Sequence, residues 1–490
     1  MKTRTKWGAA VSSALLAATL FPAAGLAGTS TTDVANSSIV LQGLSEGDTV
    51  TAYQVFDADI DGANNLTYTA AKNLPADYAT VDKLSALSTD DAKKAAADAY
   101  ASAFTSGSAT VPSNHTATAK ADEKGNATLD LDSGYWVAVV TSTSGVSKVF
   151  QPKTIDATPE IVNGKYQARV LRDQPVKSSD EQISKFVGDN GAKSVDSYTV
   201  GQSVPFKVTT NVPNYPANSK TATFAINDAP TAGLSINTDS VTVTVGTETV
   251  WQNGAAVNAA DFNSNTTKIA ATGYTFDFAK NFVLSHPGQD VVVTYNATLT
   301  SAAFANTKDG VTGNTAKITF NPNPYADSTV EPSDSTTVQT YGYVFHKTDK
   351  GGNALEGATF TLYDAQDNVV KKENGDPLTS TSTKVGDKAY VYFEDLGAGK
   401  YTAKETTVPS GKQKAQDISF TVGAVNAKAD NPATDVTETN YLVNDADVVD
   451  PDQPLLPVTG DTGTFLLTLG GVVLVSASAA LYARSRRKER

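Results

Sequence analysis

The hydrophobic positions along most of this chain alternate with polar ones or gather in short apolar runs. Residues 240–245 (Ser-Val-Thr-Val-Thr-Val) and 290–295 (Asp-Val-Val-Val-Thr-Tyr) are rich in β-branched side chains and lie between clusters of Gly, Asn, Asp and Pro. That pattern is typical of β-strands separated by turns. One stretch differs, because residues 82–104 are rich in alanine, with Thr89 and Asp90 placed to cap a helix. The sequence therefore predicts an all-β chain with one helical segment.

Clusters of Pro, Asn and acidic residues divide the chain. They occur near residues 173–180, 321–335 and 445–454, and such clusters mark loops and linkers. Domains of roughly 100–150 residues with many short strands are usually sandwiches. We therefore expect three tandem immunoglobulin-like β-sandwich domains, which are an N-terminal domain at 28–175, a middle domain at 176–330 and a C-terminal domain at 331–450.

The two ends of the chain carry export and anchoring signals. Lys2, Arg4 and Lys6 precede an apolar stretch and a small-residue site that ends at Ala27, which predicts a signal peptide at residues 1–27. Residues 464–483 contain no charge, and this length is enough for a transmembrane helix. A basic tail follows and is expected on the cytoplasmic side. Residues 451–490 are thus expected to form a stalk and a membrane anchor.

Composition narrows the classes of function. The chain has no cysteine and a formal net charge of −13, so disulfides cannot brace it, and the acidic balance argues against nucleic acid as a partner. Asp57, Asp59 and Asp61 resemble the start of a calcium loop, but Tyr68 stands where that loop needs Glu. No hydrolase motif or metal-ligand spacing is present. We expect no enzyme, no metal and no cofactor.

The C-terminal anchor is preceded by the motif Leu456-Pro457-Val458-Thr459-Gly460. In this position it resembles the sorting signal of Gram-positive surface proteins, a Leu-Pro-x-Thr-Gly motif that sortases read. The resemblance implies that a sortase cleaves between Thr459 and Gly460 and joins Thr459 to another amine. The chain would then pass from transient membrane anchoring to attachment at the cell wall peptidoglycan.

The expected C-terminal domain resembles the collagen-adhesin B-type domain of Gram-positive pilins. Its first strand contains Phe345-His346-Lys347, a later strand contains Tyr401-Thr402-Ala403-Lys404-Glu405-Thr406, and the closing strand ends in Tyr441-Leu442-Val443-Asn444. That family forms an intramolecular isopeptide bond between a first-strand Lys and a last-strand Asn, assisted by a Glu. The resemblance implies Lys347, Asn444 and Glu405 for these roles.

These residue types suit the chemistry. Burial lowers the pKa of a lysine, so that the neutral amine is a nucleophile, and burial raises the pKa of an acid, which can then relay protons. Attack on the asparagine side chain expels ammonia and leaves a neutral amide, which removes the cost of a buried charge. A surface lysine, a capping Glu and a turn Asn without a bond are the alternative.

The expected middle domain resembles the A-type relative of the same fold family. It contains Lys185-Phe186-Val187 in its first strand, Asn227-Asp228-Ala229-Pro230 in the region of the family's relay Asp, and Gly313-Asn314-Thr315-Ala316 in its last strand. The resemblance implies a second triad of Lys185, Asp228 and Asn314, with Asn321 as the alternative asparagine.

The N-terminal domain shares part of the B-type signature. When residues 131–141 are set against 396–406, Trp136 falls on Tyr401 and Val140 falls on Glu405. The acid position therefore holds an apolar residue. Without this relay we expect no isopeptide bond within residues 28–175.

Shaft pilins of this family also carry a lysine that accepts the sortase-activated threonine, in a Tyr-Pro-Lys-Asn motif at the end of the first domain. This chain has Gln174-Pro175-Val176-Lys177 there, so the position matches although the motif does not. Lys177 is the expected polymerisation lysine and Lys165 the next candidate.

The sequence as a whole predicts the shaft subunit of a fimbria that a pilus-type sortase polymerises and a housekeeping sortase attaches to the wall. Expected partners are further copies of the chain, minor pilins and peptidoglycan, with a host-surface ligand as a possibility. The alternative is a wall-anchored monomeric adhesin, or a base or tip pilin. The chain lacks the large extra domain that tip adhesins usually add.

Overall fold

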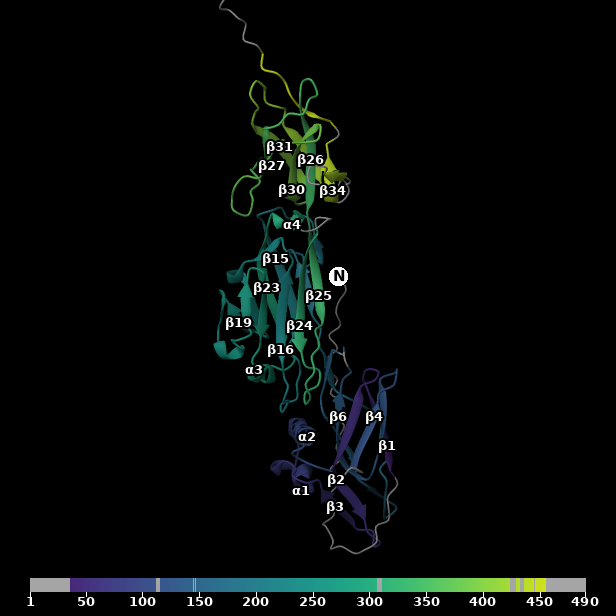
Figure 1. Cartoon of the computed structure of the whole chain (residues 1–490). Helices are drawn as coiled ribbons and strands as arrows, with labels where there is room; N and C mark the ends of the chain where they lie inside the picture. Colours follow the sequence, from purple (N-terminus) through teal and green to yellow (C-terminus); the bar gives the residue numbers. More distant parts are fainter. Residues whose placement is uncertain are drawn as a thin grey trace, which may run out of the picture. The chain divides into compact units, whose positions relative to one another are not determined.

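A computed structural model describes residues 36–111, 115–143, 145, 147–305, 311–423, 429–431, 436–444 and 446–454. These residues form two compact units, one up to Gln339 and one from Thr340 onward. The expected signal peptide, sorting motif and membrane segment all lie outside the described residues. Among the helices that are described, none has the length and apolar character needed to cross a membrane. The all-β expectation is confirmed, with strands filling both units (Figure 1).

The N-terminal part of the first unit is a sandwich of two sheets. One sheet has the order β3-β2-β6-β8, with β4 beside β2; its strands are β2 (Thr49–Ile60), β3 (Leu66–Ala70), β4 (Thr116–Lys120), β6 (Gly134–Thr141) and β8 (Lys153–Ala157). The other sheet has the order β11-β1-β5, formed by β1 (Ser37–Gln42), β5 (Asn126–Leu131) and β11 (Gln174–Pro175). Alternate residues of β1 and β5, such as Leu41 and Leu129, face Trp136 of β6 in a common core.

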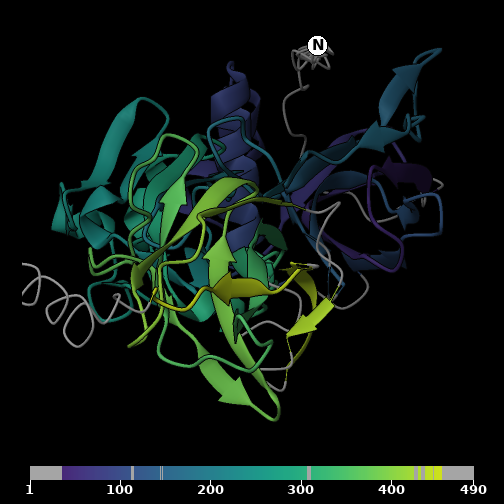
Figure 2. The same cartoon turned by 90° about the horizontal axis from the view of Figure 1, so that it is seen from above.

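The predicted helical segment packs on this sandwich. It forms α1 (Val81–Ser85) after a short turn η1 (Ala76–Tyr78), and then α2 (Asp90–Thr105), the blue-violet helix in Figures 1 and 2. The Thr89 side chain accepts a hydrogen bond from the Ala92 backbone N–H, as the capping pattern predicted. Phe104 of α2 stacks on Tyr53 of β2, with ring centroids 5.2 Å apart. The helices thus bury the outer face of the β2–β6 sheet.

The middle part of the first unit is a larger sandwich. One sheet runs β13-β15-β23-β18-β19-β20, with β17 beside β23, from β13 (Ser184–Val187), β15 (Ser203–Asn211), β17 (Leu234–Ile236), β18 (Thr242–Val245), β19 (Glu248–Gln252), β20 (Ala255–Ala256) and β23 (Asp290–Leu299). The other runs β14-β25-β24-β16-β22-β21, from β14 (Ser194–Val195), β16 (Phe224–Pro230), β21 (Lys268–Ala270), β22 (Gly273–Asp277), β24 (Val311–Phe320) and β25 (Ser333–Gln339). Short helices α3 (Lys280–Ser285) and α4 (Ala302–Ala305), with turns η3 (Thr238–Ser240) and η4 (Ala259–Asp261), complete it.

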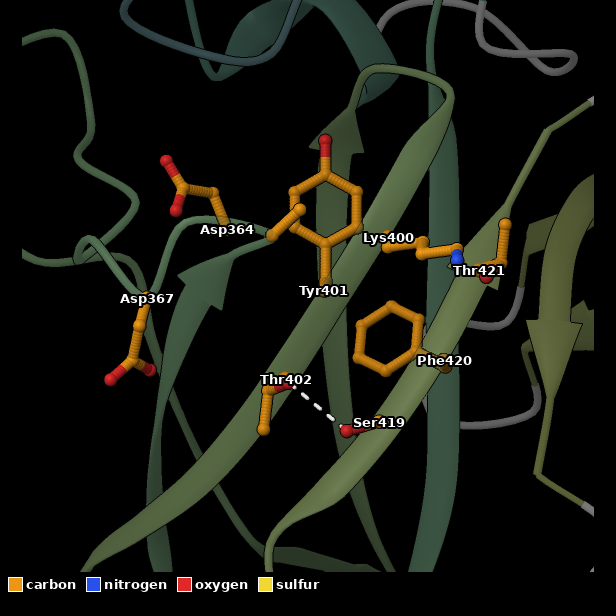
Figure 3. Close-up of a pocket in the computed structure, with 9 residues that line it drawn as sticks. Asp364, Asp367, Lys400, Tyr401, Thr402, Ser419, Phe420 and Thr421 are labelled. Atoms are coloured by element: carbon orange, nitrogen blue, oxygen red, sulfur yellow. Dashed lines mark hydrogen bonds between the residues drawn. The ribbon is translucent and has the colours of Figure 1, made fainter.

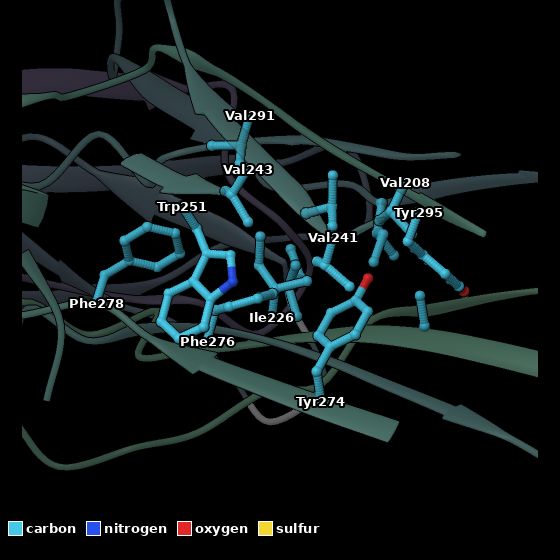
Figure 4. Close-up of a cluster of buried hydrophobic side chains, with 14 of the residues drawn as sticks. Val208, Ile226, Val241, Val243, Trp251, Tyr274, Phe276, Phe278, Val291 and Tyr295 are labelled. Carbon is cyan, nitrogen blue, oxygen red and sulfur yellow. The ribbon is translucent and has the colours of Figure 1, made fainter. Parts of the chain in front are cut away.

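The core of the middle sandwich lies between these two sheets. In Figure 4 the rings of Trp251, Phe276 and Phe278 gather at one end of the cluster, and Tyr295 lies at the other. Trp251 meets Phe276 edge-on at 4.9 Å between centroids. Alternation along β18 and β23 places Val243, Val245, Val291 and Val293 inward, as expected for strands with a period of two.

The end of the first unit differs from the expected boundary after residue 330. β25 pairs with β24 along its whole length, from Ser333 opposite Lys317 to Gln339 opposite Val311. This pairing assigns residues up to Gln339 to the middle sandwich. Only Thr340 separates β25 from the first strand of the second unit, which begins at Tyr341.

The second unit is a sandwich of its own. One sheet runs β29-β30-β26-β34-β33, with β35 beside β26, from β26 (Tyr341–Asp349), β29 (Thr383–Val385), β30 (Lys388–Leu396), β33 (Ala429–Asn431), β34 (Val436–Val443) and β35 (Val448–Asp450). The other runs β28-β27-β31-β32, from β27 (Thr359–Asp364), β28 (Thr379–Thr381), β31 (Gly399–Thr407) and β32 (Ile418–Val422). Contacts thus group the chain into two units, and the three-domain division stays a prediction.

The N-terminal and middle parts share a polar junction built around Glu181. β7 (Lys148–Phe150) pairs with β12 (Ser178–Asp180), and Val149 of β7 packs into the middle core. The Glu181 side chain is fully buried and accepts hydrogen bonds from the Ser179 hydroxyl and the Asn211 amide. Burial raises the pKa of Glu181 to about 7.

This buried acid makes the stability of the first unit depend on pH. The pKa of Glu181 is raised in the folded chain, so its stabilising contribution is complete below the unfolded value near 4.5 and is lost as pH rises through about 7. Between pH 5 and 8 the free energy of unfolding of the first unit should fall by roughly 2–3 kcal/mol. The charge of Asp180 also raises the pKa of Glu181, and Glu181 in turn raises the pKa of Tyr215, although burial is the larger cause for both.

The measurement is denaturant unfolding at several pH values, with Glu181→Gln as the comparison. The variant cannot ionise at this position, so its stability should vary less with pH. An unchanged pH profile in Glu181→Gln would contradict the assignment.

Candidate functional site

Lys185 lies in the interior of the middle sandwich. β13 carries it opposite Val208 of β15, and its side chain is 0% exposed. Its Nζ lies 5.3 Å from the ring centroid of Phe206 and 5.2 Å from that of Tyr295. A lysine amine is almost never buried this deeply without polar partners.

The polar partners of Lys185 come from three other strands. Its Nζ contacts the carboxylate of Asp228 on β16 and donates to the hydroxyl of Tyr295 on β23 at 2.7 Å. Tyr295 donates to Asp228 at 2.9 Å, and the Asn314 amide of β24 donates to Tyr295 at 2.7 Å. The structure therefore brings the three predicted residues Lys185, Asp228 and Asn314 together around one hydroxyl.

Burial shifts the pKa values of Lys185 and Asp228 in the directions that favour their neutral forms. It lowers the pKa of Lys185 and raises the pKa of Asp228, and the mutual attraction of their charges opposes both shifts. Both directions favour a neutral amine beside a protonated carboxyl. This is the state in which lysine nitrogen is a nucleophile.

A glycine on the neighbouring strand allows close packing against the backbone of Asp228. Gly273 of β22 lies beside Asp228 with φ +146°, and a Cβ added there would lie 2.5 Å from the Asp228 carbonyl oxygen. Only glycine therefore allows β22 to approach β16 this closely. Asn321, the alternative asparagine, is also buried but bonds elsewhere, donating from Nδ2 to the Ala326 carbonyl at 2.8 Å.

Sequence reasoning missed Tyr295. It ends the strand-like run 290–295, and its inward position follows from the alternation of β23. A tyrosine at an inward position of a strand has a hydroxyl that needs a buried partner. The need of this hydroxyl for a buried partner was the signal from which a role for Tyr295 could have been predicted.

Lys347 is buried in the second unit in the same way. It lies on β26 with a fully buried side chain, and its Nζ is 2.6 Å from Oδ1 of Asp450 on β35, which is equally buried. The Lys347 Nζ also donates to the Val448 carbonyl at 3.2 Å. β35 pairs with β26 in parallel, with Lys347 opposite Val448, and this register brings Asp450 to the amine.

Glu405 lies beside this pair on β31. Its side chain is buried and accepts a hydrogen bond from the Ala415 backbone N–H at 2.6 Å. Burial, reinforced by the charge of Asp450 and opposed by that of Lys347, raises the pKa of Glu405 to about 7. An acid with this pKa both gives and takes protons near neutral pH.

The structure does not bring Asn444 to Lys347. Asn444 is half-buried, donates from its backbone N–H to the Val344 carbonyl, and donates from Nδ2 to the Ala446 carbonyl at 2.6 Å. The β26–β34 register places it before Lys347, because Val443 lies opposite Val344. The closing strand resumes as β35, and its Asp450 takes the position expected for Asn444. Of the triad Lys347, Asn444 and Glu405, the structure brings Lys347 and Glu405 near each other, and Asn444 bonds elsewhere.

The N-terminal sandwich contains the local counterpart of this region. Trp136 Nε1 donates to the Asp132 carbonyl at 3.0 Å, and the Tyr401 hydroxyl donates to the Gly397 carbonyl at 2.9 Å, each four residues back. The alignment of these two strands is thus supported by geometry. Val140, at the position of Glu405, is buried.

The predicted acceptor lysines are both exposed. Lys177 lies between β11 and β12, where its carbonyl accepts from the Gln151 backbone N–H at 2.9 Å. Lys165 begins β10 (Lys165–Gln167), which forms a two-stranded hairpin with β9 (Glu160–Val162). Either lysine is therefore accessible from solvent, as an acceptor lysine needs to be.

A surface hollow of about 430 Å³ lies on the second unit, away from Lys347. Figure 3 shows it along β31 and β32, where Tyr401 and Phe420 project between Asp364 and Thr421. The hydroxyls of Thr402 and Ser419 are hydrogen-bonded at 3.1 Å on its floor. These two hydroxyls therefore satisfy each other, and the charged side chains of Asp364, Asp367 and Lys400 also line the hollow.

The acidic run that resembles a calcium loop begins in β2, which contains Asp57 and Asp59, and only Asp61 lies at the turn that follows. Asp61 accepts hydrogen bonds from the backbone N–H groups of Ala63 and Asn65 at 2.9 and 2.8 Å. In the part of the chain that the structure describes, no group of three His, Cys, Asp or Glu side chains is arranged to hold a metal ion.

Two protein-family models match parts of this sequence. A family model described as the SpaA prealbumin-like fold domain matches residues 342–439, and the LPXTG cell wall anchor motif matches residues 449–490. The chain therefore ends in a cell wall anchor motif, preceded by a prealbumin-like domain. The first match includes Lys347 and Glu405 and ends before Asn444 and Asp450.

Solved structures extend the likeness to most of the chain. The T6 backbone pilin of Streptococcus pyogenes, described as a modular three-domain structure, is similar at a TM-score of 0.65 and 16% identity over 87% of this chain and 100% of that one. The full-length major pilin SpaD of Corynebacterium diphtheriae is similar at a TM-score of 0.50 and 16% identity over 86% of this chain and 98% of that one. Among curated proteins, none matches the sequence.

Replacing Tyr295 by Phe tests the hydroxyl at the centre of the first cluster. The ring would still pack against Phe206, but Lys185, Asp228 and Asn314 would lose their shared partner. We expect the free energy of unfolding of the first unit to fall by about 1–3 kcal/mol. Denaturant unfolding followed by tryptophan fluorescence measures it.

The matched control is Tyr325→Phe. The Tyr325 hydroxyl is buried in the same unit and has no hydrogen-bond partner among the described residues. Its removal should change stability by less than about 0.5 kcal/mol. Equal losses for both variants would show that the Tyr295 network contributes nothing specific.

Proposed function

We propose that this chain is the structural shaft subunit of a covalently polymerised fimbria on a Gram-positive cell. The observation that carries the proposal is the combination of a backbone-pilin fold over 87% of the chain with a cell wall anchor motif at its end. A sortase would join Thr459 of one copy to Lys177 of the next, and a final transfer would attach the fibre to peptidoglycan. The repeating unit would contain the three sandwiches expected at residues 28–175, 176–330 and 331–450. The boundary between the second and the third would lie after Gln339.

Two internal amide bonds would brace the subunit in place of disulfides. In the middle sandwich, Lys185 Nζ attacks Cγ of Asn314, the C–N bond of the carboxamide breaks, and ammonia leaves. Asp228 carries the proton from the attacking amine to the leaving nitrogen. The proposal is supported by the burial of all three groups and by the pKa shifts that favour a neutral amine.

In the second unit we propose that Lys347 bonds to Asp450 instead of Asn444. Lys347 Nζ attacks Cγ of the Asp450 carboxyl, one C–O bond of that carboxyl breaks, and its oxygen leaves as water with two protons supplied by the amine and acid pair. Glu405 relays the proton that comes from the amine. Support comes from the 2.6 Å approach of Nζ to Oδ1 in a fully buried site, and from the direct influence of Asp450 on the pKa of Glu405.

Mass spectrometry of proteolytic fragments distinguishes the two partners of Lys347. A bond to Asp450 lowers the mass of the linked fragment by one water, about 18 Da, whereas a bond to Asn444 lowers it by one ammonia, about 17 Da. Asp450→Ala should abolish the link, Asp450→Asn should change the loss to ammonia, and Asn444→Ala should leave the link unchanged. Loss of the link in Asn444→Ala would restore the asparagine assignment.

An immunoblot of wall extracts boiled in detergent tests the shaft assignment and the acceptor together. The wild type should give a ladder of high-mass bands, and Lys177→Ala should give only monomer, because amide linkage survives boiling. Lys165→Ala is the matched control and should keep the ladder. A ladder that survives Lys177→Ala moves the acceptor to Lys165. A single monomer band in the wild type would support a wall-anchored adhesin or a minor pilin with a host ligand.

A further inference from the structure

The Tyr295 hydroxyl contacts both side chains that would react in the middle sandwich. Its oxygen accepts hydrogen bonds from Lys185 Nζ and from Asn314 Nδ2, each at 2.7 Å, and its proton is donated to Asp228 at 2.9 Å. A hydroxyl has one donor and two acceptor positions, so all three are in use. The attacking nitrogen and the leaving nitrogen therefore lie against the same oxygen atom.

Packing fixes the position of this hydroxyl. Tyr295 lies on β23 opposite Phe206 of β15, and the two rings stack with centroids 5.2 Å apart. Tyr274 of β22 meets the Tyr295 ring edge-on at 5.6 Å. Figure 4 shows both tyrosines within the cluster of buried side chains. A ring that is packed from two sides keeps its hydroxyl in one place between the reacting groups.

Burial confines proton transfer to the side chains of this cluster. Lys185, Asp228, Tyr295 and Asn314 are each at most 3% exposed. A proton that leaves the amine at this depth passes to a neighbouring protein group rather than to bulk water. The nitrogen of Asn314 leaves readily only as ammonia, so the site needs a proton donor beside Nδ2. The Tyr295 hydroxyl occupies that position.

We propose that Tyr295 is a catalytic residue of the middle sandwich, whose hydroxyl passes its proton to Asn314 Nδ2 and takes a replacement from Asp228. This inference rests on the proposed function and deepens it, because it adds a second relay group to the same reaction. The proton path then runs from Lys185 through Asp228 and Tyr295 to the leaving nitrogen.

The transfer needs no further reactant. Attack of the neutral amine on Cγ of Asn314 leaves a positive charge on Nζ and a negative charge on the former carbonyl oxygen. The Asp228 carboxyl gives its proton to the Tyr295 oxygen as the Tyr295 proton moves to Nδ2, and the resulting carboxylate takes a proton from Nζ. The Cγ–Nδ2 bond then breaks, ammonia leaves, and both relay groups end protonated, as they began.

The two proton movements at Tyr295 occur together. Burial and the charge of Asp228 raise the pKa of Tyr295 well above its usual value, so a free phenolate is unfavourable. The hydroxyl therefore gives up its proton only as it receives another. Asn314 also interacts with Asp228, so direct transfer from the carboxyl to Nδ2 is the competing route.

The rate of ammonia loss tests the relay. We would synthesise the full chain in a cell-free reaction, stop samples with acid at intervals, digest them, and weigh the fragments that contain Lys185 and Asn314. Linkage lowers the combined mass of these fragments by about 17 Da, which is one ammonia. Tyr295→Phe should link at least about tenfold more slowly than the wild type, since a positioned proton donor contributes a factor of roughly 10²–10⁴.

Tyr274→Phe is the matched control for this measurement. Tyr274 lies opposite Asp228 on the neighbouring strand and is as buried as Tyr295, but its hydroxyl has no hydrogen-bond partner among the described residues. The variant removes the same atom from the same core and should link within about threefold of the wild-type rate. Equal slowing in both variants would overturn the relay, because loosened packing would then explain the effect.

Fluorotyrosine in place of Tyr295 separates proton transfer from positioning, and it decides the case in which Tyr295→Phe does not fold. It keeps the ring and the hydroxyl, but its phenol is more acidic. If the hydroxyl transfers a proton, the linkage rate between about pH 6 and 8 should change by at least about threefold. An unchanged rate would overturn the relay, since a hydroxyl that only holds its neighbours in place is insensitive to its own acidity.

The wild type separates the relay from the bond on which it depends. Linkage of Tyr295→Phe at the wild-type rate would overturn the relay and leave the Lys185–Asn314 bond intact, formed by direct transfer from Asp228. No ammonia loss in the folded wild type would overturn that bond itself, and with it the proposed bracing of the middle sandwich.

Discussion

The structure depends on the burial of two lysine amines, each in the core of a sandwich and each against an acid. Lys185 and Lys347 are both fully buried, and each contacts a carboxyl that is itself removed from water. A charged amine costs several kcal/mol in such a place unless it is neutralised or paired. The two sites resolve this cost with different partners, since Tyr295 and Asn314 complete the first, and Asp450 and Glu405 complete the second. Conversion to a neutral amide would remove the cost altogether.

Much of the fold followed from the sequence because its determinants are local. The alternation in residues 240–245 and 290–295, the Thr89 cap and the shared strand around Trp136 and Tyr401 are all short-range signals. The boundary near residue 330 was misplaced because it depends on a long-range pairing between β24 and β25. No local pattern distinguishes a strand that closes one sandwich from one that opens the next.

The site residues show the same difference between local signals, which the sequence reveals, and long-range pairing, which it does not. Lys185, Asp228 and Asn314 were predicted from a resemblance carried by short strand motifs, and the structure brings them together. Tyr295 was missed because its role exists only in three dimensions. Asn444 was assigned from the resemblance as the asparagine of the closing strand. In the structure that strand breaks and resumes, and a register visible only in the sheet places Asp450 beside Lys347. Sequence spacing alone does not reveal such an interruption.

The single residue between β25 and β26 has a mechanical consequence. Thr340 is the whole connection between a strand of the first unit and a strand of the second, so there is no coiled linker that could lengthen under tension. If both amide bonds form, a pulling force could extend the chain very little at this junction before the sandwiches themselves unfold. If such subunits form the proposed fibre, the fibre would extend very little under tension. A force applied at its outer end would then be transmitted to the cell wall with little elastic extension.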